Sequence, residues 1–423
     1  LLHTDTLTQI PNKQYFMKTA EKILDNNSDK SYLLTSLDAR NFKLINERFG
    51  HIVGDQTLMN IAKNIKSKFH KNGLYARSQS DSFLILVEDT SQNRELLKSL
   101  VDLDISIHNT TNYKVPLKIG VCPIPRYNPA LSLSLYIDRA NIAKKYTSVR
   151  NTNYICYFTD DMNKKLNMKN MIESEMVRAL SKGEFVVYYQ PKYEIANDTI
   201  IGAEALVRWN HKEKGIISPG VFIPVFERNG FIVDLDFYVY EQVLKMQKHR
   251  LDMGKKVIPI SMNVSRCHLS DTNFVDKLEA VVAKYKVPKQ YIEMEITESI
   301  FSQEDSSAIA LIYNLKEHGF TISMDDFGSG YSSLNLLRKV PIDTLKIDKV
   351  FIDSTEDVQR SQVIVEEIIN MASKIHVKTI CEGVETQSQR DFLKIAGCNM
   401  VQGYFYSKPL PYEDFSNLLN SSK

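Results

Sequence analysis

The sequence predicts an α/β protein built of two parts, an N-terminal α/β sandwich and a C-terminal (β/α)8 barrel, which are joined by a helix. Three observations lead to this prediction. At 423 residues the chain is too long for one ordinary core. Up to residue 160, strand-like and helical stretches are mixed, as in a small sandwich. From residue 183 onward, short apolar runs alternate with helical segments in about eight units, the number that such a barrel needs.

Composition excludes several classes of partner. The 53 basic and 51 acidic side chains leave a formal net charge of +2, so no bulk attraction to a nucleic acid polymer or to anionic lipid is expected. The five cysteines are scattered and never form a CxxC pair, which is typical of reduced thiols in a cytoplasmic protein. No run of about 18 apolar residues predicts a membrane segment. Because the chain begins at Leu1, we expect it to be part of a longer protein with a sensor or a membrane anchor.

Residues 1–160 carry the mixed pattern of the first part. The stretches "SYLLTSLDA", "SFLILVED" and "VPLKIGVCPI" predict strands, whereas "GDQTLMNIAKNIKSKF" has apolar residues at helical spacing. Residues 161–182, "DMNKKLNMKNMIESEMVRALSK", keep the helical spacing and contain no Gly or Pro. They predict the linker helix between the two parts.

In residues 183–423, polar residues stand at or near the ends of the apolar runs. For example, "VIPISMN" ends at Asn263, "FTISMDD" ends at Asp326 and "KTICE" ends at Glu382. Because the C-terminal ends of barrel strands converge on one face, where active sites lie, residues up to roughly 200 positions apart would meet there. The residues expected to converge are Gln190, Glu204, Asn263, Glu295, Asp325, Asp326, Lys346, Glu382 and Gln402.

Carboxylates dominate this set, and Lys346 is the single cation expected among them. Carboxylates that share a pocket cannot all stay ionised unless positive charge lies between them. Oxygen ligands select Mg²⁺ or Mn²⁺ rather than zinc. The adjacent Asp325 and Asp326 would suit two metal ions, a type of site that hydrolyses phosphoesters. The alternative is that such residues are helix N-caps or turn residues, but their recurrence on successive strand ends disfavours it.

The second part resembles the EAL-domain phosphodiesterases, which hydrolyse cyclic di-GMP. The resemblance covers residues 168–420, and eight motifs carry it: "YQP", "EALVRW", "NVS", "EITE", "DDFGSGYSSL", "LKID", "EGVET" and "QGY". It implies that the barrel opens cyclic di-GMP to linear pGpG with two Mg²⁺ or Mn²⁺ ions. It also implies a homodimer.

The same resemblance implies roles for individual residues. One metal would be held by Glu204, Asn263, Glu295 and Asp325, and the second by Asp325, Asp326 and Glu382. The catalytic residues would be Lys346, Glu204, Glu382 and Glu298. In this set Glu298 steadies the loop at 327–331, which couples dimerisation to metal binding. The dinucleotide would be bound by Gln190, Arg208, Glu385 and Gln402.

The first part resembles a GGDEF domain, the diguanylate cyclase fold, through "DTLTQIPNKQYF", "LDARNFKLINERFGHIVGDQTL" and "RSQSDSFLIL". The signature has decayed to "QSDSF", with Gln79 and Ser80 for the glycines and Ser82 for an acidic metal ligand. Cyclase activity is therefore expected to be absent. The residues that the resemblance implies for GTP binding remain, namely Asp38, Asn46 and Asp55. Two interpretations stay open: the domain binds GTP and regulates the barrel, or it is an inert dimerisation or spacer domain.

The function that the sequence favours is a metal-dependent cyclic di-GMP phosphodiesterase with a degenerate cyclase domain. The alternatives are a non-catalytic cyclic di-GMP receptor, whose pocket binds without cleaving, and a scaffold. The complete set of metal ligands and Lys346 favours the enzyme.

Overall fold

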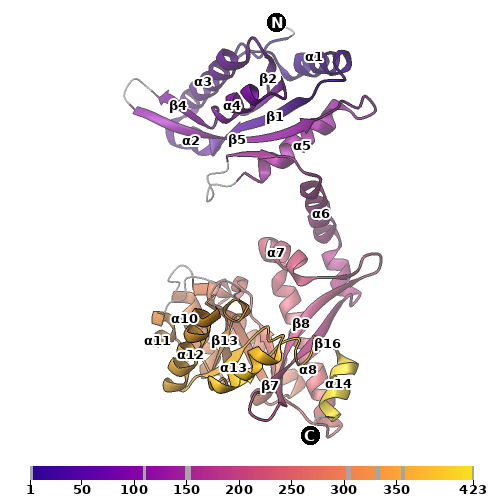
Figure 1. Cartoon of the computed structure of the whole chain (residues 1–423), viewed down its shortest axis with the longest axis vertical. Coiled ribbons are helices and arrows are strands. Elements are labelled where there is room, and N and C mark those ends of the chain that lie inside the picture. The colour runs from indigo at the N-terminus through magenta and orange to yellow at the C-terminus, as the bar shows by residue number, and fades with distance from the viewer. Residues whose placement is uncertain are drawn as a thin grey trace. The chain divides into compact units, whose positions relative to one another are not determined.

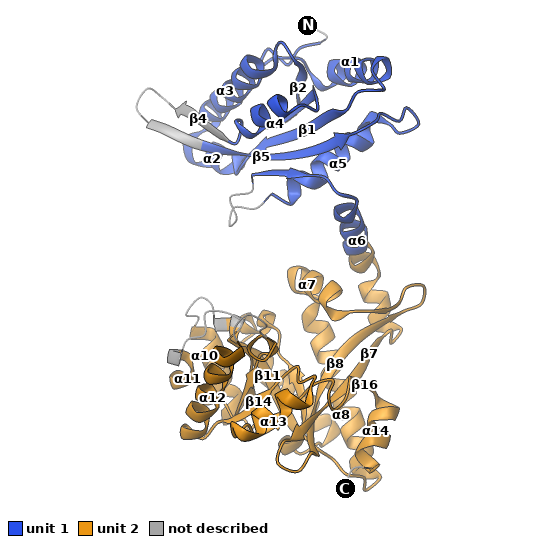
Figure 2. Ribbon diagram, in the orientation of Figure 1, with its two compact units in different colours: residues 1–170 blue, residues 171–423 orange. Residues whose placement is uncertain are grey.

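A computed structural model gives the fold (Figure 1), and it describes residues 3–107, 111–147, 154–301, 306–328, 334–353 and 358–421. The chain divides into two compact units, residues 1–170 and 171–423 (Figure 2). Each unit has its own core, and each is described by itself below. In the described part of the chain, no helix is both long enough and apolar enough to cross a membrane.

The N-terminal unit is a sheet with helices on both faces. The strands are β1 (Tyr32–Ala39), β2 (Gly73–Gln79), β3 (Ser82–Glu88), β4 (Asp102–Ile107), β5 (Thr111–Ile124) and β6 (Ile155–Tyr157). Their order is β2-β3-β1-β5-β4, and β6 pairs with β5. The helices are α1 (Lys13–Asn26), α2 (Phe42–Phe49), α3 (His51–Phe69), α4 (Ser91–Lys98) and α5 (Leu133–Lys145).

The central strand β1 divides this core in two. Because successive side chains of a strand point to opposite faces, Leu33 packs with Ile61 of α3, whereas Leu34 packs with Phe16 of α1 and Ile137 of α5. The expected α/β sandwich is therefore confirmed.

The helix expected over 161–182 is α6 (Asp160–Ser181), and the boundary between the two units falls inside it. Its second half is attached to the barrel by polar contacts. Arg178 pairs with Glu184 at 2.9 Å, and Glu175 lies 3.3 Å from Nε2 of the buried His211.

The C-terminal unit contains a closed barrel of eight strands. These are β7 (Phe185–Glu194), β8 (Thr199–His211), β10 (Ile260–Asn263), β11 (Ile292–Thr297), β12 (Thr321–Phe327), β13 (Thr344–Ile347), β14 (Lys378–Cys381) and β15 (Met400–Val401). Pairing of β7 with both β8 and β15 closes the ring. Two short strands pair antiparallel beside the barrel strands: β9 (Gly215–Ile217) pairs with β8, and β16 (Leu410–Pro411) pairs with β7. The (β/α)8-like barrel predicted from the sequence is confirmed.

One detail of that prediction is wrong. The strands from β8 to β15 run parallel, but β7 runs antiparallel to both of its neighbours. A parallel neighbour needs a crossover of a dozen residues or more. Residues 195–198 leave no room for one between β7 and β8.

Helices cover the outside of the barrel. They are α7 (Pro219–Asn229), α8 (Ile232–Asp252), α9 (Phe274–Tyr285), α10 (Ser306–Glu317), α11 (Leu334–Lys339), α12 (Val358–Lys374), α13 (Gln387–Ile395) and α14 (Tyr412–Ser421). Alternate strand residues such as Met294, Ile322 and Leu345 are fully buried and belong to one apolar core with residues of these helices. The residues between them are polar and belong to the barrel interior. The strand pattern therefore places the site.

Candidate functional site

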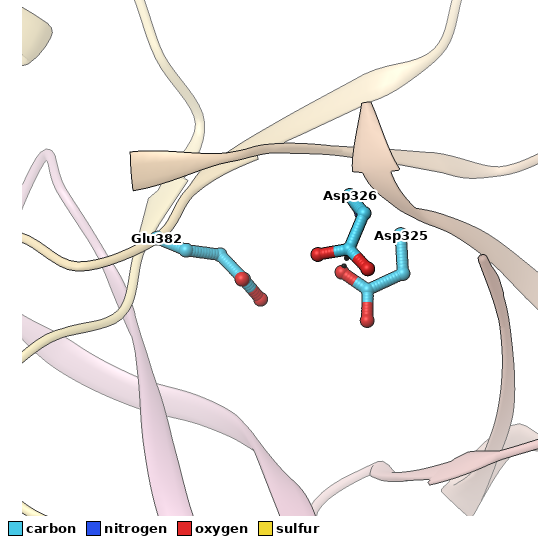
Figure 3. A group of neighbouring side chains, drawn as sticks. All are labelled: Asp325, Asp326 and Glu382. Atoms are coloured by element: carbon cyan, nitrogen blue, oxygen red, sulfur yellow. Dashed lines mark hydrogen bonds between the residues drawn. The ribbon is translucent and has the colours of Figure 1, made fainter. Parts of the chain in front are cut away.

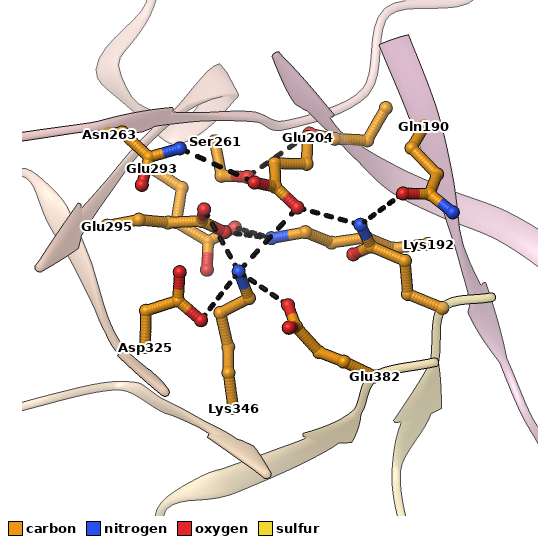
Figure 4. Close-up of polar contacts among 12 residues, drawn as sticks. Gln190, Lys192, Glu204, Ser261, Asn263, Glu293, Glu295, Asp325, Lys346 and Glu382 are labelled. Carbon is orange, nitrogen blue, oxygen red and sulfur yellow. Dashed lines mark hydrogen bonds and ion pairs between the residues drawn. The ribbon is translucent and has the colours of Figure 1, made fainter. Parts of the chain in front are cut away.

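The barrel interior brings together most of the polar residues expected to converge (Figure 4). Strand register aligns them, since Gln190 lies opposite Glu204 and Asn263 lies opposite Glu295. On the next pair of strands, Thr297 lies opposite Asp325. Neighbouring strands thus present polar side chains at similar heights.

Lys346 lies at the centre of this group and is 1% exposed. Its Nζ is 2.6 Å from Glu382 Oε1, 3.0 Å from Asp325 Oδ1, 3.1 Å from Glu295 Oε2 and 3.6 Å from Glu204 Oε2. Burial alone would lower the pKa of the ammonium group, but the four carboxylates outweigh it and hold that pKa well above its usual value. Lys346 is therefore the charge partner of the cluster.

A second buried cation, Lys192 of β7, lies beside Lys346 in the barrel interior (Figure 4). Its Nζ contacts Glu293 Oε2 at 3.2 Å and Glu295 Oε1 at 2.9 Å. The expectation of a single cation was therefore wrong. The missed signal was period-two spacing, because Lys192 stands two residues after Gln190 and Glu293 two residues before Glu295.

Asp325 and Asp326 lie at a break in the strand pairing. The register between β12 and β13 shifts between Met324 and Phe327, and Asp326 has φ +58°, a strained value for a residue other than glycine. Its backbone N–H donates to Asp325 Oδ1 at 2.9 Å. Regular alternation would send adjacent side chains to opposite faces. The irregular backbone instead keeps both carboxylates at the same site (Figure 3).

Glu382 completes a candidate metal group with these two aspartates. One oxygen from each of the three carboxylates lies within 4.8 Å of the other two. Burial and the Asp325 charge raise the pKa of Asp326 to about 6. Burial and the Asp325 charge also raise the pKa of Glu382, to about 8, although the nearby Lys346 ammonium acts to lower it. Without a metal ion, this group therefore resists full ionisation. Its donors are all oxygens, which suits a hard divalent ion.

Gln402 and Asn263 hold Glu204 on the other side of the cluster, and Gln402 also bonds to Gln190. Gln402 Nε2 donates to Glu204 Oε2 at 2.7 Å and to Gln190 Oε1 at 3.1 Å. Asn263 Nδ2 donates to Glu204 Oε1 at 3.4 Å. Burial raises the pKa of the Glu204 carboxyl. The predicted ligands Glu204 and Asn263 thus adjoin the predicted substrate residues Gln190 and Gln402.

Arg208 and Glu385 lie apart from this cluster. In the described part of the chain, no hydrogen bond or ion pair joins either residue to it. Arg208 lines an adjoining pocket of about 380 Å³, and its guanidinium lies 5.8 Å from the centre of the Tyr188 ring. Glu385 is exposed, and its backbone N–H donates to Gln389 Oε1.

The pocket beside Arg208 is bounded by Asn263 of the cluster and by Asp236 of α8. Asp236 Oδ2 lies 2.9 Å from Nε2 of the buried His268, and it accepts from the Ser265 N–H at 3.3 Å. Sequence reasoning missed Asp236 because it lies inside a helix rather than at a strand end.

Glu298 is buried and accepts a hydrogen bond from the Gly328 N–H at 3.1 Å, so it contacts the segment that follows the paired aspartates. Gly328 has φ +97°, and a Cβ built on it would lie 1.9 Å from the Phe351 ring. Of the predicted loop at 327–331, residues 329–331 lie outside the described residues.

The predicted GTP residues lie on three elements of the N-terminal unit, β1, α2 and α3. Asp38 of β1 lies opposite Ser82, and its Oδ1 is 2.7 Å from Lys144 Nζ. Burial and the Asp38 charge raise the pKa of Asp81, which stands in the turn between β2 and β3. Asn46 of α2 is half-buried against Gly54, whereas Asp55 of α3 is exposed.

Comparison with known families places both units. Residues 173–409 match the EAL domain family, and residues 2–148 match the family described as diguanylate cyclase, GGDEF domain. Each of these ranges lies within one of the two units seen in the structure.

Proteins similar to the chain include two curated relatives and one solved structure. The bifunctional diguanylate cyclase/cyclic di-GMP phosphodiesterase MucR of Pseudomonas aeruginosa is 28% identical over 97% of this chain and 60% of its own length. The cyclic di-GMP phosphodiesterase PdeR of Escherichia coli is 30% identical over 97% of this chain and 62% of its own length. The chain thus spans about three fifths of each relative. The PaMucR phosphodiesterase structure in complex with c-di-GMP is 33% identical, with a TM-score of 0.55, over 58% of this chain and 99% of that one.

Proposed function

The chain belongs to the EAL domain family, and on this premise we propose that its barrel hydrolyses the second messenger cyclic di-GMP. The observation that carries the proposal is the buried cluster in which Lys346 contacts four carboxylates beside the Asp325–Asp326–Glu382 group. The names of the relatives MucR and PdeR and the cyclic di-GMP bound to the PaMucR structure support the choice of substrate.

The charges of the cluster support two divalent ions as cofactors. Among the described side chains, six carboxylates, from Glu204, Glu293, Glu295, Asp325, Asp326 and Glu382, surround the two ammonium groups of Lys192 and Lys346. Full ionisation would leave four negative charges, which two Mg²⁺ or Mn²⁺ ions would offset. We assign Glu204, Asn263, Glu295 and Asp325 to one ion and Asp325, Asp326 and Glu382 to the other.

The reaction would add water across one phosphodiester bond of the ring. The water oxygen joins phosphorus, the sugar oxygen leaves with a proton, and linear pGpG results. Two bound divalent ions would supply an activated water and stabilise the leaving oxygen. Lys346 would orient that water and offset charge on the phosphate, because its ammonium group already lies where the carboxylates converge.

The adjoining pocket would hold part of the dinucleotide. Its walls are largely aliphatic, including Ile223, Leu235 and Val239, and would pack against a purine ring. The Asp236 carboxylate would accept hydrogen bonds from the N–H groups of a guanine edge, while Arg208 would bind phosphate. Gln190 and Gln402 would orient Glu204, and Glu385 would reach the substrate from the rim. Glu298 would hold the segment after the aspartates in place.

We further propose that the N-terminal unit lacks cyclase activity but binds GTP at Asp38, Asn46 and Asp55. Asp38 and Asp81 share the one ammonium group of Lys144, which leaves an excess carboxylate that would suit the Mg²⁺ ion of a bound triphosphate. Isothermal titration of GTP with Mg²⁺ tests this part. Absence of heat would make the unit an inert spacer or dimerisation domain.

We also propose that the chain forms a homodimer and is cytoplasmic. The five free cysteines support the location, and sedimentation would test the dimer.

The test of the function begins with metal-stripped protein and cyclic di-GMP. Mn²⁺ or Mg²⁺ is added with and without GTP, and pGpG is followed by chromatography. Product that requires metal supports the phosphodiesterase, and faster product formation with GTP supports regulation by the first unit. Tight binding of cyclic di-GMP without product would place the chain among non-catalytic receptors, and the absence of binding would make it a scaffold.

A further inference from the structure

Lys192 is one of the most buried charged residues in the barrel, at 3% exposed, and it belongs neither to the assigned metal ligands nor to the assigned catalytic residues. It comes from β7, the one strand that runs antiparallel to its neighbours. Opposite it on β8 stands Gly202, which has no side chain to obstruct the lysine. The lysine therefore lies across the barrel toward β11, where both of its carboxylate partners lie (Figure 4).

Two different lysines hold Glu295, one at each oxygen, and the Ser261 hydroxyl also bonds to this carboxylate. Lys192 Nζ contacts Oε1 at 2.9 Å, and Lys346 Nζ contacts Oε2 at 3.1 Å. The side chain is 0% exposed, so it is shielded from bulk solvent. Because Lys192 fixes Oε1, Oε2 is directed toward Lys346 and the carboxylates around it. The orientation of Glu295 therefore depends on Lys192.

Glu293 balances the charge of Lys192. It stands two residues before Glu295 on the same face of β11, and its Oε2 lies 3.2 Å from Lys192 Nζ. Glu293 offsets the charge of Lys192 in the overall count, and the short contact of Lys192 with Glu295 holds that carboxylate in place. A buried ion pair need not be present for stability, because replacing such a pair by apolar residues of similar volume often leaves the folded state as stable as before.

We propose that Lys192 is a positioning residue for the metal centre and acts through Glu295. The proposal rests on the proposed function, in which Glu295 binds one of two divalent ions. Partners that orient a metal ligand typically change metal affinity by about 10- to 100-fold when they are removed. Lys192 belongs to this class because its bond sets the direction of the free oxygen of Glu295.

Two double variants separate positioning from charge and volume. Lys192→Met with Glu293→Met removes one positive and one negative charge together with the donor to Glu295. Lys192→Gln with Glu293→Gln removes the same two charges, and its side chains match those of the Met pair in length. It differs in keeping an N–H donor at position 192. Mn²⁺ affinity is measured by the electron paramagnetic resonance signal of free Mn²⁺, and folding is followed by thermal unfolding in EDTA.

The Met pair should weaken Mn²⁺ binding by about 10- to 100-fold, and the Gln pair by less than about threefold. Equal Mn²⁺ affinity of the wild-type chain and the Met pair would overturn the role of Lys192 while leaving the proposed function intact. Equal weakening by both pairs would also overturn it, because charge or packing would then be the cause. If the Met pair fails to fold, Lys192→Leu/Glu293→Gln is compared with Lys192→Gln/Glu293→Gln, because only the second keeps the donor. Weaker Mn²⁺ binding by the first alone supports the role of Lys192, and equal binding by the two overturns it. A wild-type chain that binds no Mn²⁺ would refute the metal centre itself and this inference with it.

Discussion

Lys346 Nζ lies 2.6 Å from Glu382 Oε1, at the point where strands β13 and β14 end in the barrel. The contact joins the buried cation to the carboxylate group formed by Glu382 and the paired aspartates. It links the two sets of residues to which we assign one ion each.

Glu204→Gln should abolish hydrolysis while the fold persists. The substitution keeps the shape of the side chain and one oxygen for Gln402, but it removes the negative charge assigned to a metal. Turnover should fall by a factor on the order of 100 or more, because charge stabilisation of the transition state by the ion is lost. Steady-state kinetics and thermal unfolding in EDTA provide the check. Wild-type turnover in this variant would refute the role of Glu204.

Lys346→Met should affect rate more than substrate binding. The ammonium group would act in the transition state, so its loss should lower turnover by about 100- to 1,000-fold. Affinity for cyclic di-GMP measured in Ca²⁺ should change far less. The same variant leaves four carboxylates without their common partner, so metal-free protein should lose roughly 3–5 kcal/mol of stability. Mn²⁺ should restore much of it, and a variant equally stable with and without Mn²⁺ would contradict this account.

The metal-free protein should become less stable between about pH 5 and pH 8. The pKa values of Asp326 and Glu382 are raised to about 6 and about 8, so the folded state binds more protons than the unfolded state in this window. Stability therefore falls as pH rises, and Mn²⁺ affinity rises because protons no longer compete. Unfolding temperatures at both pH values test the sign. Glu382→Gln is the control and should flatten the dependence.

Gly328→Ala should impair turnover through the segment after the aspartates. The new methyl group would meet the Phe351 ring, and the positive φ disfavours a side chain, so the hydrogen bond to Glu298 and the position of Asp326 should both change. A loss of roughly tenfold to a hundredfold is expected from such misplacement.

Gly230→Ala is the matched control for this prediction. Gly230 has a similar φ of +83°, but a Cβ there would meet nothing within 4 Å. It should cost about 1–2 kcal/mol of stability and leave turnover unchanged. Equal turnover in the two variants would show that the Gly328 segment does not position the site.

The strand-end residues were predictable because a barrel converts sequence order into convergence. Asn263, Glu295, Asp325 and Lys346 each belong to a short strand, and their polar character stands out against apolar neighbours. Gln190 also reached the cluster, although β7 runs in the opposite direction. It lies opposite Glu204, so the pairing register brings it there rather than the end of its strand.

Other features required coordinates. Lys192 reads as an ordinary strand lysine until β7 is seen to run antiparallel and to face Glu293 and Glu295. The sequence gives no sign that Asp326 has a left-handed backbone, since the residue that usually adopts this conformation is glycine. Asp236 enters the pocket from a helix, at a position that strand-end reasoning does not examine.

The most direct test of the central claim is the formation of pGpG from cyclic di-GMP by metal-stripped wild-type chain and Glu204→Gln, each titrated with Mn²⁺ in parallel. We predict that product appears only with wild-type protein and only once Mn²⁺ is added. Product formed without metal, or at equal rates by both proteins, would contradict the assignment of this carboxylate cluster as a metal-dependent phosphodiesterase site.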